Sequence, residues 1–158
     1  MRIVGKIESL WRYPVKSMRG EELQEAFAGY PGVYGDRVFA FKSSASPTGF
    51  PYFTAREQRR LLQYRPRFRF PDKAARPVNL SEADKIGAGP LSADISELMV
   101  DIETPDGKTI AIDDPALVEM LCSEIDNKHQ LTLMRSHRAM TDCRPMSLFS
   151  LQSAQQLS

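Results

Sequence analysis

The chain has 158 residues, which is about the length of one domain and enough to bury a hydrophobic core. Its net charge is +1 at pH 7, so no overall field attracts it to nucleic acid or to a membrane surface, and an electrostatic function requires a local patch. The apolar runs are far shorter than the roughly 20 residues that span a bilayer, and the first ten residues, MRIVGKIESL, lack the apolar segment of a signal peptide. We therefore expect a cytoplasmic protein.

Strand patterns dominate the N-terminal half of the chain. Apolar and polar residues alternate there over short segments that are bounded by glycine, proline and serine. Pro51 removes a backbone donor, which favours an edge position or a bulge for the strand that contains it. The predicted strands are RIVGKIESLW (2–11), ELQEAFA (22–28), RVFAFK (37–42), FPYFT (50–54) and RPRFRF (65–70), with a turn at GYPGVYG (29–35) and one or two helical turns at REQRRLLQY (56–64).

Two contrasting segments follow. Residues 71–97 are rich in proline, alanine, serine, aspartate and glycine and contain few large apolar side chains, so they predict a long loop or an insertion. Residues 98–112 read LMVDIETPDGKTIAI and predict two strands joined by a turn at Pro105–Asp106–Gly107.

The C-terminal part predicts two helices. The first covers about residues 115–126, with Pro115 in its first turn and an apolar stripe behind it. A strand at residues 130–136 precedes the tail at residues 147–158, which reads as a strand entering a second helix. Strands outnumber helices in this scheme, so the fold class expected is mainly β, a small mixed β-barrel with the 115–126 helix packed on it. The candidate N-caps are Asp113 or Asp114 for the first helix and Ser150 or Ser153 for the second.

The cysteines and histidines do not indicate a metal site. Cys122 and Cys143 have no CxxC partner, and His129 and His137 complete no metal-ligand spacing. Cys122 falls in the apolar register of the predicted helix, which favours a buried, inert thiol. Cys143 lies beside Arg144, which would favour its thiolate, but a structural thiol remains the preferred interpretation.

Three motifs occur in a defined order: YPVKSMRG (13–20), GVYGDRVFAF (32–41) and FTARE (53–57). Together they resemble the N-terminal β-barrel domain of MOSC proteins. These are molybdenum-cofactor proteins that include the amidoxime-reducing components and the C-terminal region of molybdenum-cofactor sulfurases. The resemblance covers residues 1–70 well and residues 98–158 more loosely.

The resemblance implies a domain organisation. Residues 1–145 would form the MOSC N-terminal β-barrel domain, and residues 146–158 would be the beginning of a MOSC domain, truncated. The cysteine that ligates molybdenum in this family lies deep in the MOSC domain, beyond residue 158. Cys143 therefore inherits no role from the family, and we expect no metal ligand and no catalytic residue in this chain alone.

The resemblance also implies a cofactor site. In relatives that bind the cofactor, the lysine and serine of YPVKS and the arginine of the DR pair contact the pyranopterin and its phosphate. The matching residues are Lys16, Ser17 and Arg37. Because the tail resembles the entry to the MOSC domain, Ser150 and Ser153 are additional candidates for cofactor binding.

The chemistry of these residues suits a phosphate. Lys16 offers a point charge, Ser17 a hydroxyl donor and Arg37 a planar fork. As an anion site, their charges should be unpaired by protein acids and should face the side where the second domain docks. The alternative is that Lys16 is solvated and that Arg37 pairs with Asp36 or Glu21.

Neighbouring residues are expected to have structural roles. Arg19 should lie on the solvated side of the same loop. Arg56 should form an internal ion pair with Glu57 or Asp36, with an anion site as the alternative. Trp11 and Tyr13 should pack into the barrel.

The function implied by the resemblance is that of an accessory domain. It would contribute a basic loop to the pterin and phosphate of the molybdenum cofactor (molybdopterin) and support a catalytic MOSC domain of the same parent chain. The parent would be a molybdenum-dependent oxidoreductase or a sulfur carrier that also meets a redox partner protein, whereas the isolated chain would not be catalytic and would hold no cofactor by itself.

Two alternatives to this function stay open. Residues 56–69 hold six arginines and one acid with interleaved aromatic residues, which is typical of a groove that binds single-stranded nucleic acid. A purely structural or interaction barrel is the other.

Overall fold

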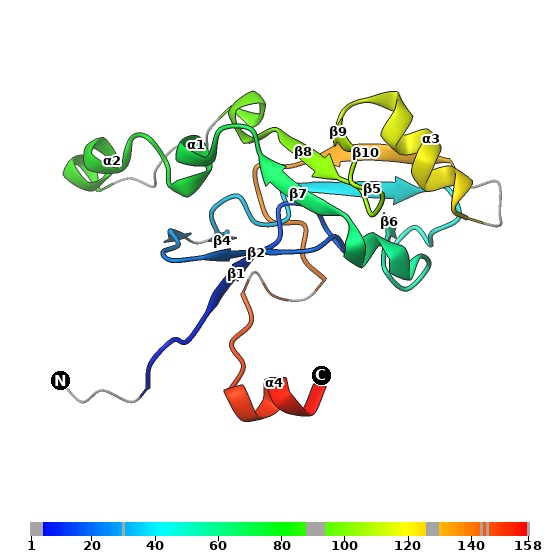
Figure 1. Ribbon diagram of the computed structural model, residues 1–158. Helices are drawn as coiled ribbons and strands as arrows, with labels where there is room; N and C mark the ends of the chain where they lie inside the picture. The colour runs from blue at the N-terminus through cyan, green and yellow to red at the C-terminus, as the bar shows by residue number, and fades with distance from the viewer. Residues whose placement is uncertain are drawn as a thin grey trace.

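The computed structural model describes residues 5–29, 31–87, 94–125, 130–142, 144 and 146–157 (Figure 1). About a quarter of these residues are helical and about a quarter lie in strands. The expected dominance of strands is therefore wrong. The difference comes mainly from residues 71–98, which contain three short helices where a loop was predicted.

Two three-stranded antiparallel sheets form the centre of the molecule. In one sheet β5 lies between β10 and β6, and in the other β8 lies between β7 and β9. Four of the five residues of β5 are buried, as befits a central strand, while β6 forms an edge, which is one of the two alternatives that Pro51 predicted. The strands are β5 (Phe39–Ser43), β6 (Tyr52–Phe53), β7 (Arg65–Phe68), β8 (Val100–Glu103), β9 (Thr109–Ala111) and β10 (Leu131–Arg135), and each overlaps a predicted strand.

Four further strands form two small hairpins. They are β1 (Leu10–Arg12) with β2 (Glu21–Leu23), and β3 (Ala28–Gly29) with β4 (Gly32–Val33).

Three predictions about the strands are wrong. Of the strand predicted over residues 2–11, residues 2–4 lie outside the described residues, and residues 5–9 are exposed and belong to no strand, so that β1 begins only at Leu10. The strand predicted at 22–28 is split between β2 and β3. Within the described residues the strands belong to four separate sheets, none of which closes on itself, so the predicted barrel is not seen.

Short helices fill the segment for which a loop was predicted. The first two of them lack a stripe of large apolar residues: the buried side chains are Ala74 in α1 and Ala83 in α2, whereas the third helix buries Leu98. A helix that buries only alanine gives a weak amphipathic signal, which explains the wrong prediction. The helices of this region are η1 (Arg59–Gln63), where helical turns were predicted, α1 (Pro71–Ala75), α2 (Leu80–Ile86) and η2 (Ile95–Leu98).

Helix α3 (Pro115–Ser123) confirms the predicted helix, although it ends three residues early. The Asp114 side chain caps it by accepting a hydrogen bond of 2.9 Å from the Ala116 backbone N–H. Leu117 and Leu121, one turn apart, are fully buried and attach the helix to the core.

Removing this cap gives a direct test of the assignment. Asp114→Ala should lower the free energy of unfolding by about 1 kcal/mol, because the first turn loses the acceptor for an otherwise unpaired N–H. Urea unfolding would measure the difference. Glu119→Ala, at an exposed position of the same helix, is the control and should stay within about 0.5 kcal/mol of the wild type. Equal stabilities for both variants would contradict the capping role.

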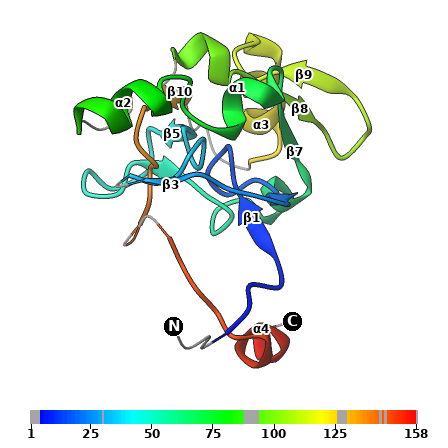
Figure 2. The ribbon, with the colours of Figure 1, turned by 90° about the vertical axis from the view of Figure 1, so that its left-hand side faces the viewer.

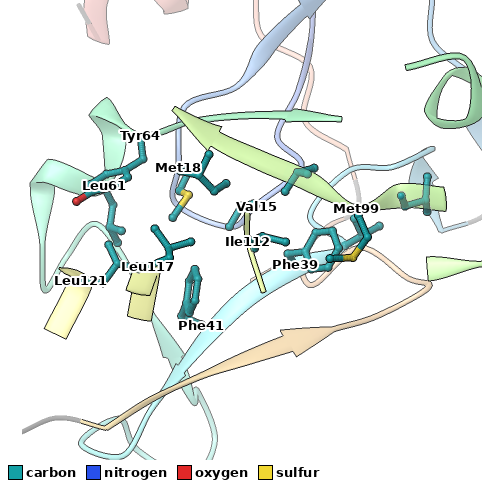
Figure 3. Packing of buried hydrophobic residues seen from close by; sticks show 14 of the residues in the cluster. Val15, Met18, Phe39, Phe41, Leu61, Tyr64, Met99, Ile112, Leu117 and Leu121 are labelled. Carbon is teal, nitrogen blue, oxygen red and sulfur yellow. The ribbon is translucent and has the colours of Figure 1, made fainter. Parts of the chain in front are cut away.

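The hydrophobic core anchors the loop that follows β1. Figure 3 shows Val15 and Met18 of this loop pointing into the same cluster as Phe39 and Phe41 of β5 and Leu117 of α3. Val15 and Met18 are 0% and 1% exposed. The loop is therefore fixed at two points, and the residues between them, 16 and 17, have defined positions.

Tyr64 ties the end of η1 to the end of α3. Its side chain is buried, and its hydroxyl donates a hydrogen bond of 2.9 Å to the Glu124 carboxylate. Burial, together with this hydrogen bond, raises the pKa of the Tyr64 hydroxyl well above its usual value, so the group stays neutral and remains a donor.

The C-terminal helix α4 (Leu151–Leu157) confirms the second predicted helix, and Ser150 caps it by accepting a bond of 3.0 Å from the Ser153 N–H. No strand precedes it among the described residues 146–150. Figures 1 and 2 both show α4 lying apart from the sheets. No helix among the described residues is long and apolar enough to cross a bilayer.

Candidate functional site

The chain brings residues 13–17 and residue 37 side by side. The Arg37 N–H donates to the Tyr13 carbonyl at 2.6 Å, and the Phe39 N–H donates to the Pro14 carbonyl at 3.2 Å. In return, the Lys16 N–H donates to the Phe39 carbonyl at 2.8 Å. Residues that are about 20 positions apart in sequence are thus held together by backbone hydrogen bonds.

Ser17 and Arg37 share an unusual backbone conformation. Their φ angles are 64° and 47°, and among the described residues they are the two non-glycine positions with positive φ. A non-glycine residue in this region costs on the order of 1–3 kcal/mol, and such positions gather at ligand clamps and active sites. The strain therefore coincides with two of the residues that the sequence predicts to bind a ligand.

Lys16, Ser17 and Arg37 line one open pocket of about 420 Å³. Its walls come from the loop after β1, from the turn before β5, from η1 and from the segment that follows β10. The remaining lining residues are Tyr13, Met18, Leu62, Asp142, Arg144 and Ser147.

Lys16 is buried and paired. It is 6% exposed, and its ammonium donates to the Met140 carbonyl at 3.1 Å and to the Asp142 carboxylate. The ammonium also lies 4.7 Å from the centre of the Tyr52 ring and 5.6 Å from that of Phe50. The expectation of an unpaired charge is wrong for Lys16, because burying an ammonium without a counterion is too costly.

Arg37 is paired as well. Its Nε and Nη2 lie 2.6 and 2.5 Å from Oδ2 of Asp36, the partner named as the alternative. The other Asp36 oxygen accepts a bond of 2.8 Å from the Tyr13 N–H, and the Asp36 side chain is only 4% exposed. Asp36 therefore fixes both the loop and the guanidinium, while Arg37 keeps 25% of its side chain exposed at the pocket.

Tyr13 and Trp11 were expected to pack into the barrel. This prediction is wrong, because their side chains are 43% and 46% exposed. Tyr13 lies at the pocket wall, against Gly20. A Cβ at Gly20 would lie 2.7 Å from Cε1 of the Tyr13 ring, so only glycine leaves room for the ring in this place. Arg19 is exposed, as expected.

Arg56 pairs differently from the prediction. Its side chain is 78% exposed, and its Nη2 lies 4.0 Å from Oδ2 of Asp142, the carboxylate oxygen that does not pair with Lys16. Glu57, the expected partner, instead accepts hydrogen bonds from the Thr54 backbone and hydroxyl. Arg56 is therefore near the pocket without being buried in an ion pair.

Sequence reasoning missed the residues that the C-terminal segment contributes to the pocket. Asp142, Arg144 and Ser147 belong to no motif, and a loop more than 100 residues away carries no local signal for Lys16. Ser150 and Ser153 are exposed, with hydroxyls 2.9 Å apart, and do not line the pocket.

The basic stretch at residues 56–69 is largely neutralised. Arg65 and Arg67 on β7 lie 3.6 and 3.8 Å from Glu103 on β8, and Arg69 donates a bond of 2.7 Å to Asp101. This hydrogen bond raises the pKa of the Arg69 guanidinium. Cations that are paired within the sheet attract phosphates weakly, so the nucleic-acid alternative loses its main support.

The described part of the chain contains no set of side chains that could ligate a metal ion. No group of three His, Cys, Asp or Glu side chains there could hold an ion. Cys122 is half-buried on α3 and His137 is exposed, whereas His129 and Cys143 lie outside the described residues.

Comparison with known proteins gives one match. Residues 4–69 match the family model of the MOSC N-terminal beta barrel domain. The matched range contains Lys16, Ser17 and Arg37. Searches of curated proteins and of solved structures return no match.

Proposed function

We propose that residues 4–69, which belong to the MOSC N-terminal beta barrel domain family, bind the pterin and phosphate of the molybdenum cofactor through Lys16, Ser17 and Arg37. The chain would act as the accessory domain of a molybdenum-dependent oxidoreductase or sulfur carrier. Its partners would be a C-terminal MOSC domain of the same parent chain and a redox protein. When bound, the cofactor would supply the redox or sulfur-transfer chemistry.

The donors in the pocket fit a phosphate ester. Lys16 and Arg37, each already paired with an aspartate, bring two cations and Ser17 a hydroxyl to one opening, and Arg144 adds a third cation, which leaves the positive charges in excess. The exposed ring of Tyr13 adds an apolar wall beside them. The described residues offer ligands for the anionic end of the cofactor and not for its metal, so the molybdenum ligand would come from outside them.

One observation carries this proposal. Two non-adjacent residues of the family motifs, Ser17 and Arg37, adopt strained left-handed backbones and meet at the same pocket. A purely structural loop could place glycine or asparagine at such positions at lower cost. Strain that is retained at two ligand-type side chains supports a binding role.

Replacing Arg37 tests the proposal. In the full parent protein, Arg37→Ala should weaken the retention of molybdopterin about 10- to 150-fold, because a charge-assisted contact is worth about 1.5–3 kcal/mol. An anaerobic titration followed by pterin fluorescence would measure the dissociation constant. Arg37→Gly separates the side chain from the backbone, since glycine accepts a φ of 47° without strain, and it should weaken binding to the same extent.

Arg19→Ala is the matched control, because Arg19 is exposed on the same loop and should leave the dissociation constant unchanged. Unchanged binding in both Arg37 variants would refute the proposed site.

A further inference from the structure

We propose that Asp142 is an internal competitor for the anionic group of the ligand. Its carboxylate holds the place on Lys16 that a phosphate takes, so that binding exchanges one anion for the other. This inference rests on the proposed site and adds its regulation: before a ligand binds, a residue from the C-terminal segment balances the charge of Lys16.

Lys16 needs an anion at all times. Lys16 is 6% exposed, and the aromatic rings of Tyr52 and Phe50 cover its ammonium. The Met140 carbonyl accepts one of its three N–H groups but brings no full charge. Asp142 supplies that charge, and a second anion could bind at the ammonium only by replacing it or by sharing it.

The Asp142 side chain is positioned so that its carboxylate can move away from the Lys16 ammonium. The Asp142 side chain is 44% exposed and lines the pocket that the ligand would enter. Asp36 shows the opposite design at Arg37: it is 4% exposed and held by the Tyr13 N–H as well as by the guanidinium. A half-exposed carboxylate regains its hydration when it moves away, whereas a buried one does not.

The displaced carboxylate also has a second cation within reach. Nη2 of Arg56 lies 4.0 Å from Oδ2 of Asp142, the oxygen that does not pair with Lys16, and the Arg56 side chain is 78% exposed. A small rotation of the Asp142 side chain would exchange Lys16 for Arg56. This gives Arg56 a positioning role that neither of its predicted roles included.

Calorimetry with inorganic phosphate, at constant ionic strength, tests the exchange on the whole chain. Asp142→Asn keeps the shape of the side chain and removes the competing charge, so phosphate should bind about 10-fold more tightly than to the wild type. Glu22→Gln removes the same charge from an exposed position on β2 and should leave the affinity unchanged. An affinity in Asp142→Asn equal to or below that of the wild type, or an equal gain in Glu22→Gln, would overturn the inference.

A second measurement follows Asp142 itself. In the wild type, saturating phosphate should move the carbon-13 shift of the Asp142 carboxyl group towards that of a solvated aspartate, and an unmoved signal would also overturn the exchange. The proposed function fails separately: it fails when Arg37→Ala leaves molybdopterin binding unchanged, whatever Asp142→Asn does to phosphate.

Discussion

Replacing Arg12 with alanine should lower the free energy of unfolding by about 3–5 kcal/mol, the cost of breaking a buried ion pair from one side. The guanidinium is 5% exposed and joins distant parts of the chain: it donates to Glu21 on β2 at 2.7 Å, to the Tyr34 carbonyl at 3.1 Å and to the Ala74 carbonyl of α1. It also lies 4.5 Å from the centre of the Phe68 ring. Alanine would leave two carbonyls and a carboxylate without this donor.

Urea unfolding would measure the loss. Arg65→Ala is the matched control, because this arginine is 45% exposed and 3.6 Å from Glu103, so its removal should cost at most about 1 kcal/mol. Arg12→Lys should also destabilise the protein, since a lysine cannot reproduce the planar fork that serves three acceptors. A loss below about 1 kcal/mol in Arg12→Ala would show that the network contributes nothing net.

Elements with a decisive local signal were predictable from the sequence. The turn at Pro105–Asp106–Gly107 fixes β8 and β9 on either side of it, and Asp114 followed by Pro115 marks the start of α3. Pro51 predicted an edge position or a bulge, and β6 lies at an edge. In each case a single residue restricts the backbone strongly enough to outweigh the rest of the chain.

Elements whose burial depends on distant partners were not predictable. Helices α1 and α2 bury Ala74 and Ala83, and an alanine is equally compatible with a loop. The alternation in residues 2–11 suggested a strand, but Ile7 is exposed, so the alternation does not mark a buried face in the described residues 5–9. Sheet closure depends on pairing between distant segments, and a local pattern contains no information about it.

The candidate site, too, was predictable from the sequence only in part. The family motifs pointed to Lys16, Ser17 and Arg37, and the structure brings all three to one pocket. One of their two counterions was predictable from the sequence and the other was not. Asp36 adjoins Arg37 and was named as the alternative partner, whereas Asp142 lies 126 residues from Lys16. The charge state of a site therefore depended on a contact that the sequence does not reveal.

Two buried cations of the same region contribute differently. Arg12 donates to the Tyr34 and Ala74 carbonyls, so its removal takes a charged donor away from two backbone acceptors. Lys16 is paired mainly with a half-exposed carboxylate, so its removal leaves a group that water can solvate. We therefore expect Arg12 to matter for stability and Lys16 to matter for binding.

Lys16→Met should separate the two properties. Methionine fills nearly the same volume and has no charge to desolvate, and the Asp142 carboxylate left behind is half-exposed to water, so the free energy of unfolding should stay within about 1 kcal/mol of the wild type. The affinity for inorganic phosphate should fall about 10- to 150-fold, because the ammonium that a phosphate would meet is gone. Urea unfolding and calorimetry on the same preparation would give both values, with Lys42→Met on the exposed face of β5 as the control for a lost surface charge. Should Lys16→Met lose more than about 1 kcal/mol of stability and keep its phosphate affinity, Lys16 would be a structural residue, and the loop after β1 would have no part in binding anions.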